Sequence, residues 1–115
     1  MSFNISERYN SIIIEFNGNV MGGPDAVHLN EKLHELIDDE KKNIVVDLSR
    51  VEVMNSSGLG MLIGALTTMR NAGGDLRIAN PSPKIEELIK ITQLHTVFQK
   101  FDSTEEAVSS FEDPA

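Results

Sequence analysis

The chain contains no cysteine among its 115 residues. Disulfides, thiolate nucleophiles and cysteine metal sites are therefore excluded. Other signals of chemistry are missing as well: there is no Gly-x-Ser-x-Gly nucleophile elbow, no His-Glu-x-x-His metal spacing and no lysine-containing glycine loop for phosphates. His28, His34 and His95 show no spacing that would supply a base for a serine nucleophile. We expect a protein that is not an enzyme and that holds no metal or cofactor.

Basic residues are few. Ten Lys and Arg stand against eighteen Asp and Glu, for a formal net charge of −8 at pH 7. Nucleic-acid binders need clustered basic side chains to neutralise phosphates, whereas the only adjacent basic pair here is Lys41-Lys42. The same acidic balance argues against docking on an anionic membrane surface. We expect another protein or a small molecule as the partner, with no nucleic acid and no membrane.

Long hydrophobic runs are absent too. The apolar stretches fall far short of the roughly 20 residues that span a bilayer, and the N-terminus lacks the basic and apolar regions of a signal peptide. These features favour a soluble, cytoplasmic protein. The length fits one domain, which we place at residues 1–111, with a short frayed tail at 112–115.

Strands and helices alternate along the chain after an opening hairpin. Pro24 suits the first turn of a helix, and the glycines after Asn71 suit a helix end. The expected strands are Phe3–Glu7, Ser11–Phe16, Ile44–Leu48, Asp75–Ala79 and Val97–Phe101, and the expected helices begin near Pro24, Asn55, Ser82 and Ser103. This order predicts an α/β fold: a mixed, mainly parallel sheet of four to five strands, with an N-terminal hairpin and about four helices.

The segment Asn55-Ser56-Ser57-Gly58-Leu59-Gly60 lies where the second helix should begin. One interpretation is that Ser56 caps the helix, because a serine oxygen can accept a bond from a free backbone N–H. The other is that Ser56 accepts a phosphate, since a helix N-terminus tolerates an anion. Gly58 and Gly60 lack a Cβ, so they suit either a closely approaching partner or helix-to-sheet packing. Spacing alone leaves these interpretations open.

Two segments around this site carry a resemblance to a known family. They are Val45-Val46-Asp47-Leu48-Ser49-Arg50-Val51 and Met54-Asn55-Ser56-Ser57-Gly58-Leu59-Gly60-Met61-Leu62. Together they resemble the signature of anti-sigma-factor antagonists, which are single-domain members of the STAS group. Residues 71–76 resemble the break after the signature helix, and residues 91–98 resemble the terminal segment of the family. The resemblance covers nearly the whole chain and implies a STAS-type fold.

The resemblance implies a partner-switching cycle. In such a cycle the unphosphorylated antagonist binds an anti-sigma factor that is also a GHKL-type serine kinase, and the sigma factor is released. Phosphorylation of the signature serine, here Ser56, ends binding, and a PP2C-type phosphatase restores the hydroxyl. The resemblance also suggests a monomer. The residues implied to bind the partner are Asn55, Ser57, Gly58, Leu59, Gly60, Met21 and Gly22.

The sequence departs from the family pattern at two positions. Asn55 stands where an aspartate is usual, and it still suits a helix cap. Met21 stands where an acidic residue is frequent, in a loop expected to lie near Ser56. Met21 either contacts the partner or packs under its loop, because methionine fills irregular gaps. Both changes bear on phosphorylation and on the choice of partner.

A second function fits the same fold. A lone STAS domain can serve as a regulatory subunit of an ABC transporter or as a signalling scaffold, without being phosphorylated. A transporter subunit would copurify with an ATPase and the membrane fraction. An antagonist would copurify with a soluble GHKL-type kinase.

Overall fold

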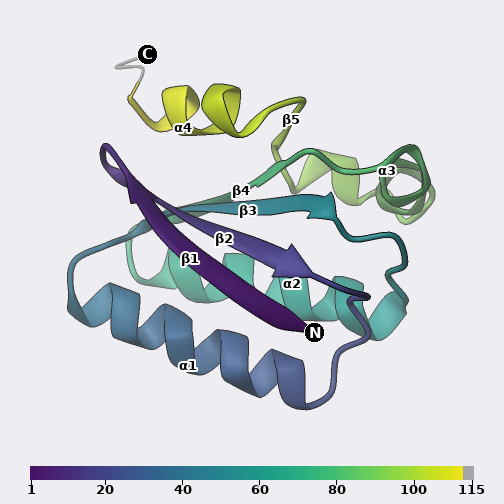
Figure 1. Ribbon diagram of the computed structural model, residues 1–115, viewed down its shortest axis with the longest axis horizontal. Coiled ribbons are helices and arrows are strands. Elements are labelled where there is room, and N and C mark those ends of the chain that lie inside the picture. The colour runs from purple at the N-terminus through teal and green to yellow at the C-terminus, as the bar shows by residue number, and fades with distance from the viewer. Residues whose placement is uncertain (113–115) are drawn as a thin grey trace.

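The computed structural model describes residues 1–112 as one α/β unit (Figure 1). An antiparallel hairpin opens the chain, and strands and helices alternate after it. The elements are β1 (Ser2–Arg8), β2 (Ser11–Asn17), α1 (Pro24–Asp38), β3 (Asn43–Arg50), α2 (Ser56–Asn71), β4 (Asp75–Ala79), α3 (Pro83–Ile91), a 3₁₀ turn (Leu94–Thr96), β5 (Lys100–Phe101) and α4 (Thr104–Glu112). The predicted fold class is confirmed.

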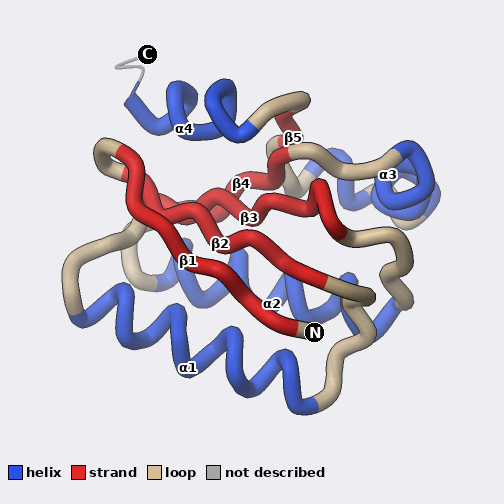
Figure 2. Tube along the Cα trace, viewed as in Figure 1, coloured by secondary structure: helices blue, strands red, loops and turns tan. Residues whose placement is uncertain are grey.

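The five strands form one mixed sheet in the order β1-β2-β3-β4-β5 (Figure 2). β1 and β2 pair antiparallel, whereas β2 with β3, β3 with β4 and β4 with β5 pair parallel. Ile14, Val46 and Ile78 lie side by side across the three central strands. The continuous apolar run in β3 follows from burial on both faces of a parallel strand. Because β2, β3 and β4 run the same way, the loops that follow them meet at one end of the sheet.

Helices cover both faces of the sheet. α1 and α2 lie on one face and α4 lies on the other (Figure 1). Leu29, Leu33 and Leu36 form the buried stripe of α1, as the helical spacing predicts. A smaller cluster lies under α4, where Ala107 and Val108 meet the second face of the sheet. No helix within residues 1–112 is long and apolar enough to cross a membrane.

The prediction of a final strand over Val97–Phe101 is largely wrong. Only Lys100–Phe101 pairs with β4. The N–H groups of Val97 and Phe98 bond back to the carbonyl of Leu94 as parts of a turn. The apolar pattern there reflects packing, since Phe98 is only 3% exposed. At the other expected boundary, α4 continues to Glu112. The rest of the expected tail, residues 113–115, lies outside the described residues.

Candidate functional site

The candidate site is built from two loops at the carboxyl ends of β2 and β3. Val20, in the loop before α1, donates its N–H to the carbonyl of Val53 at 2.9 Å. The N–H of Asn55 donates in return to the carbonyl of Val20 at 3.3 Å. The Val20 side chain is fully buried. These bonds hold the loop that carries Met21 and Gly22 against the start of α2.

Asn55, and not Ser56, caps α2. The Asn55 side-chain oxygen accepts a bond from the N–H of Gly58 at 2.8 Å, while its own backbone is extended. Ser56 is the first residue of the helix and its side chain is exposed. The interpretation of Ser56 as the cap is therefore wrong. Its hydroxyl instead lies at the end of α2 where unpaired backbone N–H groups and the positive end of the helix dipole favour an anion.

Gly58 is required by packing. A Cβ at this position would lie 1.9 Å from the carbonyl oxygen of Val20. This is far inside van der Waals contact, and the clashing atom belongs to the backbone. Gly22 is also constrained: its φ is +85°, and a Cβ there would lie 3.0 Å from the Cβ of Ser57. The helix and the loop thus approach each other closely at these two glycines.

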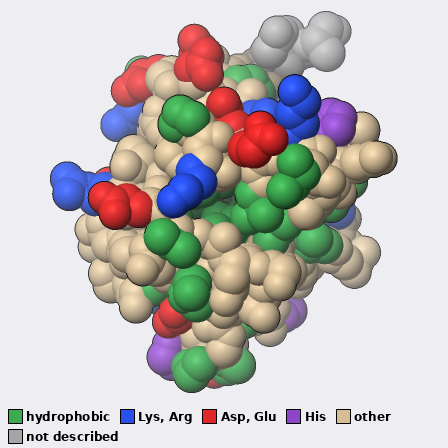
Figure 3. Space-filling model, turned by 90° about the vertical axis from the view of Figure 1, so that its right-hand side faces the viewer, with side chains coloured by type: hydrophobic (Ala, Val, Ile, Leu, Met, Phe, Trp, Pro, Cys, Tyr) green, Lys and Arg blue, Asp and Glu red, His purple; other side chains and the backbone are tan. Residues whose placement is uncertain are grey.

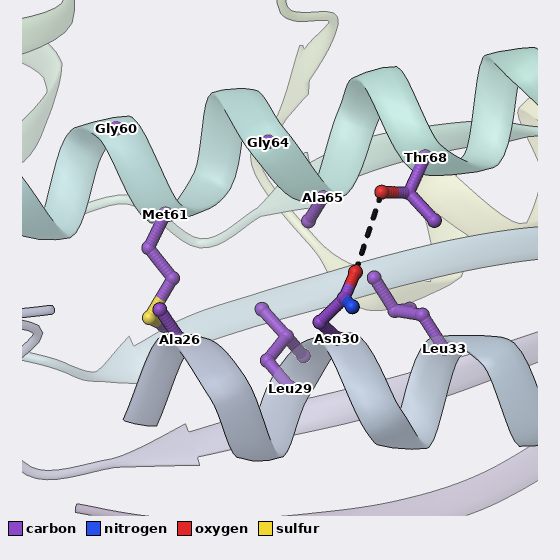
Figure 4. Close-up of a pocket in the computed structure, with 9 residues that line it drawn as sticks. All are labelled: Ala26, Leu29, Asn30, Leu33, Gly60, Met61, Gly64, Ala65 and Thr68. Carbon is purple, nitrogen blue, oxygen red and sulfur yellow. Dashed lines mark hydrogen bonds between the residues drawn. The ribbon is translucent and has the colours of Figure 1, made fainter. Parts of the chain in front are cut away.

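Gly60 has the opposite environment. It is exposed, and a Cβ placed on it would meet no atom within 4 Å. The same holds for Gly64, one turn later. Both lie along a shallow groove of about 390 Å³ between α1 and α2 (Figure 4). Across this groove the Thr68 hydroxyl donates a hydrogen bond to the side-chain oxygen of Asn30 at 3.5 Å. Of the two alternatives for the signature glycines, packing applies to Gly58, whereas Gly60 leaves the backbone of α2 open to a neighbour.

We expect Gly60→Ala to raise the free energy of unfolding by roughly 0.5–1 kcal/mol, because alanine restricts the unfolded chain and favours helix. Urea denaturation monitored by circular dichroism would measure the change. Space for the new methyl group is available. A lower free energy of unfolding would contradict the open environment of this position.

The remaining candidate residues divide between surface and interior. Met21 is 46% exposed, so it does not pack under its loop. Ser57 is exposed beside Gly22. Leu59 is buried in the main core, and Gly58 is buried against Val20. Any part that Leu59 and Gly58 play in partner binding is therefore one of positioning α2, and their role stays a prediction.

The helix that begins at Ser56 contributes few charged side chains. From Ser56 to Met69, α2 carries no ionisable side chain, and its first turn has no acidic residue. Asn55 and Met21 are also uncharged, at the two positions where the family pattern favours acids. His28 and His34 are exposed on α1, as expected for solvated histidines. Among residues 1–112, no group of three or more metal-ligating side chains is found.

Sequence reasoning missed two features of this end of the molecule. Val20 is the residue that joins the loops, and its only sequence signal is a single apolar residue within a glycine-rich turn. Two large apolar side chains are also exposed: Val53, near the candidate site, is 39% exposed, and Ile91, on α3, is 67% exposed. Ile91 falls outside the inward spacing of α3, which could have marked it as exposed.

Comparison with known proteins identifies the family of this chain. The family model of the STAS domain matches residues 2–107. The anti-sigma-B factor antagonist of Staphylococcus aureus is 32% identical over 77 residues, which cover 67% of this chain and 71% of that protein. The anti-sigma factor antagonist SpoIIAA in its unphosphorylated form has a TM-score of 0.73 at 19% identity, covering 99% of this chain and 100% of that one. The Bacillus cell fate determinant SpoIIAA in its phosphorylated form also scores 0.73, at 20% identity, covering 96% and 99%.

The fold and the site thus define a small α/β domain whose exposed signature serine begins a helix. The chain belongs to the STAS domain family. Its similarity to curated anti-sigma factor antagonists extends over most of its length. The likeness to SpoIIAA, at these low identities, bears on the fold alone.

Proposed function

We propose that this protein is an anti-sigma-factor antagonist whose binding to a partner is switched by phosphorylation of Ser56. The partner is an anti-sigma factor that is also a GHKL-type serine kinase. In its unphosphorylated form the protein binds this kinase and releases the sigma factor. The observation that carries the proposal is the position of Ser56: an exposed hydroxyl on the first residue of α2, within a chain related to anti-sigma factor antagonists.

The choice of Ser56 over Ser57 has a steric reason. Ser57 lies against the loop before α1, close enough that a Cβ on Gly22 would come within 3.0 Å of the Ser57 Cβ. Part of the space around Ser57 is thus taken by the protein's own chain. Ser56 precedes it at the helix end, next to the capping Asn55. A kinase active site that enclosed a serine would meet less of the loop at Ser56.

The surroundings of Ser56 suit a phosphate without change of fold. A phosphoserine adds about −1.5 to −2 charges near neutral pH. A helix N-terminus stabilises such a charge by about 0.3–1 kcal/mol. Because Asn55 and Met21 are neutral, neither repels it. Loss of binding would therefore arise at the interface, where the charge replaces a neutral hydroxyl, and not from unfolding of α2.

The rest of the cycle follows from the same proposal. A PP2C-type phosphatase would restore the hydroxyl of Ser56, and the protein would act as a cytoplasmic monomer made of the single domain at residues 1–111. Asn55, Ser57, Gly60, Met21 and Gly22 would contribute the surface that the kinase contacts. The acidic net charge of −8 is compatible with a protein partner and unfavourable for nucleic acid.

Phosphopeptide mass spectrometry tests this proposal. After incubation with ATP and lysate from the source cell, we expect one phosphate on the Ser56 peptide of the wild type and of Ser57→Ala, and none on Ser56→Ala. Phosphate that persists in Ser56→Ala would move the acceptor elsewhere. No phosphate in a lysate shown separately to be active would instead favour a non-phosphorylated STAS subunit of an ABC transporter or a signalling scaffold.

A further inference from the structure

The helix α4 covers the second face of the sheet with little buried surface. Its buried side chains are Ala107 and Val108, whereas α1 buries three leucines and α2 buries seven residues on the first face. Within residues 1–112, the cluster beneath α4 is small and separate from the main core: Ile13, Val45, Ala79, Ala107 and Val108. Because the free energy of burial grows with the apolar area buried, α4 is held less firmly than α1 or α2.

The outward side of α4 is polar. Glu105, Glu106 and Ser109 are exposed. Acidic and basic side chains are mixed on the surface at the top of the molecule, where α4 lies (Figure 3). Glu105 pairs with Arg8 at 3.3 Å, but both side chains are exposed, and such a pair contributes little to stability. The attachment of α4 therefore depends on the contacts of its inner side.

A buried polar group on β2 weakens the closed arrangement of this face. Ser11 precedes Ile13 by two residues, so its side chain points to the side of the sheet that α4 covers. The Ser11 hydroxyl is fully buried, and it has no hydrogen-bond partner within residues 1–112. A buried hydroxyl without a partner is destabilising, and it regains a partner when water reaches it. Opening of this face therefore relieves a penalty that the closed state bears.

Arg77 makes the best shielded polar contacts between the sheet and α4. Its Nη1 donates to the Ser110 hydroxyl at 2.7 Å, and its guanidinium carbon lies 4.0 Å from the centroid of the Phe111 ring. The Asp75 carboxylate accepts a bond from Arg77 Nε at 3.3 Å and so orients the guanidinium. The Arg77 side chain is only 16% exposed, so water screens these contacts less than it screens the Arg8 pair. Arg77 thus fastens the C-terminal half of α4.

We propose that α4 is a hinged cover: it opens as a unit about residues 102–103 while the rest of the fold stays intact, and Arg77 keeps it closed. The start of α4 stays attached to the sheet, because β5 pairs with β4 just before the hinge and Asn80 Nδ2 donates to the Thr104 hydroxyl at 3.3 Å. Opening uncovers an apolar strip of the sheet made of Ile13, Val45 and Ala79. The hinged cover involves no residue near Ser56, so it stands or falls separately from the proposed function.

Because the chain has no cysteine, thiol labelling can measure this opening. Ala79→Cys places a thiol beneath α4, and Ala65→Cys places one in the main core; both alanines are buried. The two variants carry the same conservative change, since cysteine behaves as a small hydrophobic residue. The probe is Ellman's reagent, and each labelling rate is divided by the rate of the same variant unfolded in urea. When reclosing is faster than labelling, this ratio gives the open population.

We expect Ala79→Cys to be labelled at least about 100-fold faster than Ala65→Cys, because local opening exposes only the first thiol. Adding Arg77→Met should raise the Ala79→Cys rate by about tenfold, since an ionic hydrogen bond and a cation–π contact are lost. The Ala65→Cys rate should stay within about twofold. Arg50→Met is the matched control, because it removes an exposed pair with Glu15 and should change neither rate. Equal labelling of the two thiols would overturn the hinged cover, and an equal rise of both rates in Arg77→Met would contradict the role of Arg77.

Hydrogen exchange of the unsubstituted protein makes the same comparison without an introduced thiol. We expect the backbone amides of α4 to exchange at least about 100-fold faster than those of β3. Mass spectrometry of peptides from the two elements would measure the rates. If both elements exchanged only through one common unfolding event, the proposal would be wrong, whether or not the cysteine variants fold.

Discussion

Replacing Ser56 with aspartate is expected to weaken binding to the kinase by roughly 100- to 1000-fold, whereas Ser56→Ala should bind within a few-fold of the wild type. The aspartate places a charge where the interface would enclose a neutral hydroxyl. An unpaired charge that loses its water costs several kcal/mol, and each 1.4 kcal/mol changes affinity about tenfold. The helix dipole stabilises the aspartate by about 0.3–1 kcal/mol, but it does so in the free protein too and therefore does not restore the lost affinity. The interface penalty therefore dominates.

The fold should tolerate the same change. Ser56 is the first residue of α2, where an acidic side chain is favourable, and Asn55 continues to cap the helix through Gly58. Isothermal titration calorimetry with the purified kinase would give the Kd values, and urea denaturation would show that the variants are folded. Ser109→Asp is a suitable control, because it adds the same charge to an exposed residue of α4. Binding of Ser56→Asp equal to that of Ser109→Asp would contradict an electrostatic switch.

Much of the fold could be predicted because local signals and the sheet pattern agree. Pro24 and the Ser82-Pro83 pair mark two helix starts, and Ser82 accepts a bond from the N–H of Ile85 as a cap should. The Tyr9-Asn10 turn joins β1 to β2 in register. The segment at Val97–Phe101 could not be predicted in this way. A short apolar run has no period that separates a strand from a buried turn.

The sequence predicted which segments form the candidate site, but not the contacts that each residue makes there. The signature indicated the segment from Asn55 to Gly60. The expected nearness of the Met21 loop to this segment is confirmed by the bond from the Asn55 N–H to the carbonyl of Val20. The individual roles depend on contacts that are distant in sequence. Gly58 and Gly60 differ by two positions, yet only Gly58 meets the Val20 carbonyl. The sequence alone does not show which residues of a helix face the loop packed against it. It therefore could not show that the two glycines have different environments.

The contact between Gly58 and Val20 leads to the largest expected loss of stability, in Gly58→Ala. The new Cβ would lie 1.9 Å from the Val20 oxygen and 2.6 Å from its carbonyl carbon. Overpacking of this kind costs about 1–3 kcal/mol when side chains can adjust, and here the obstacle is backbone. Relief requires α2 and the loop to move apart, which would break the bond from Asn55 to Val20 and strain the bond from Val20 to Val53. Each lost bond adds about 0.5–1.5 kcal/mol.

We therefore expect Gly58→Ala to lower the free energy of unfolding by roughly 2–5 kcal/mol, even after alanine's better helix propensity is counted. That is a large part of the total stability of a domain, which is typically about 5–15 kcal/mol. Gly60→Ala is the matched control, since the same chemical change two residues later should have the opposite sign. Urea denaturation of both variants measures the pair, and equal shifts in the two midpoints would contradict the close approach of α2 to Val20. The same clash separates Met21 and Gly22 from the start of α2. Gly58→Ala should therefore also slow the phosphorylation of Ser56 in the molecules that remain folded. A purely local packing defect would leave that rate unchanged.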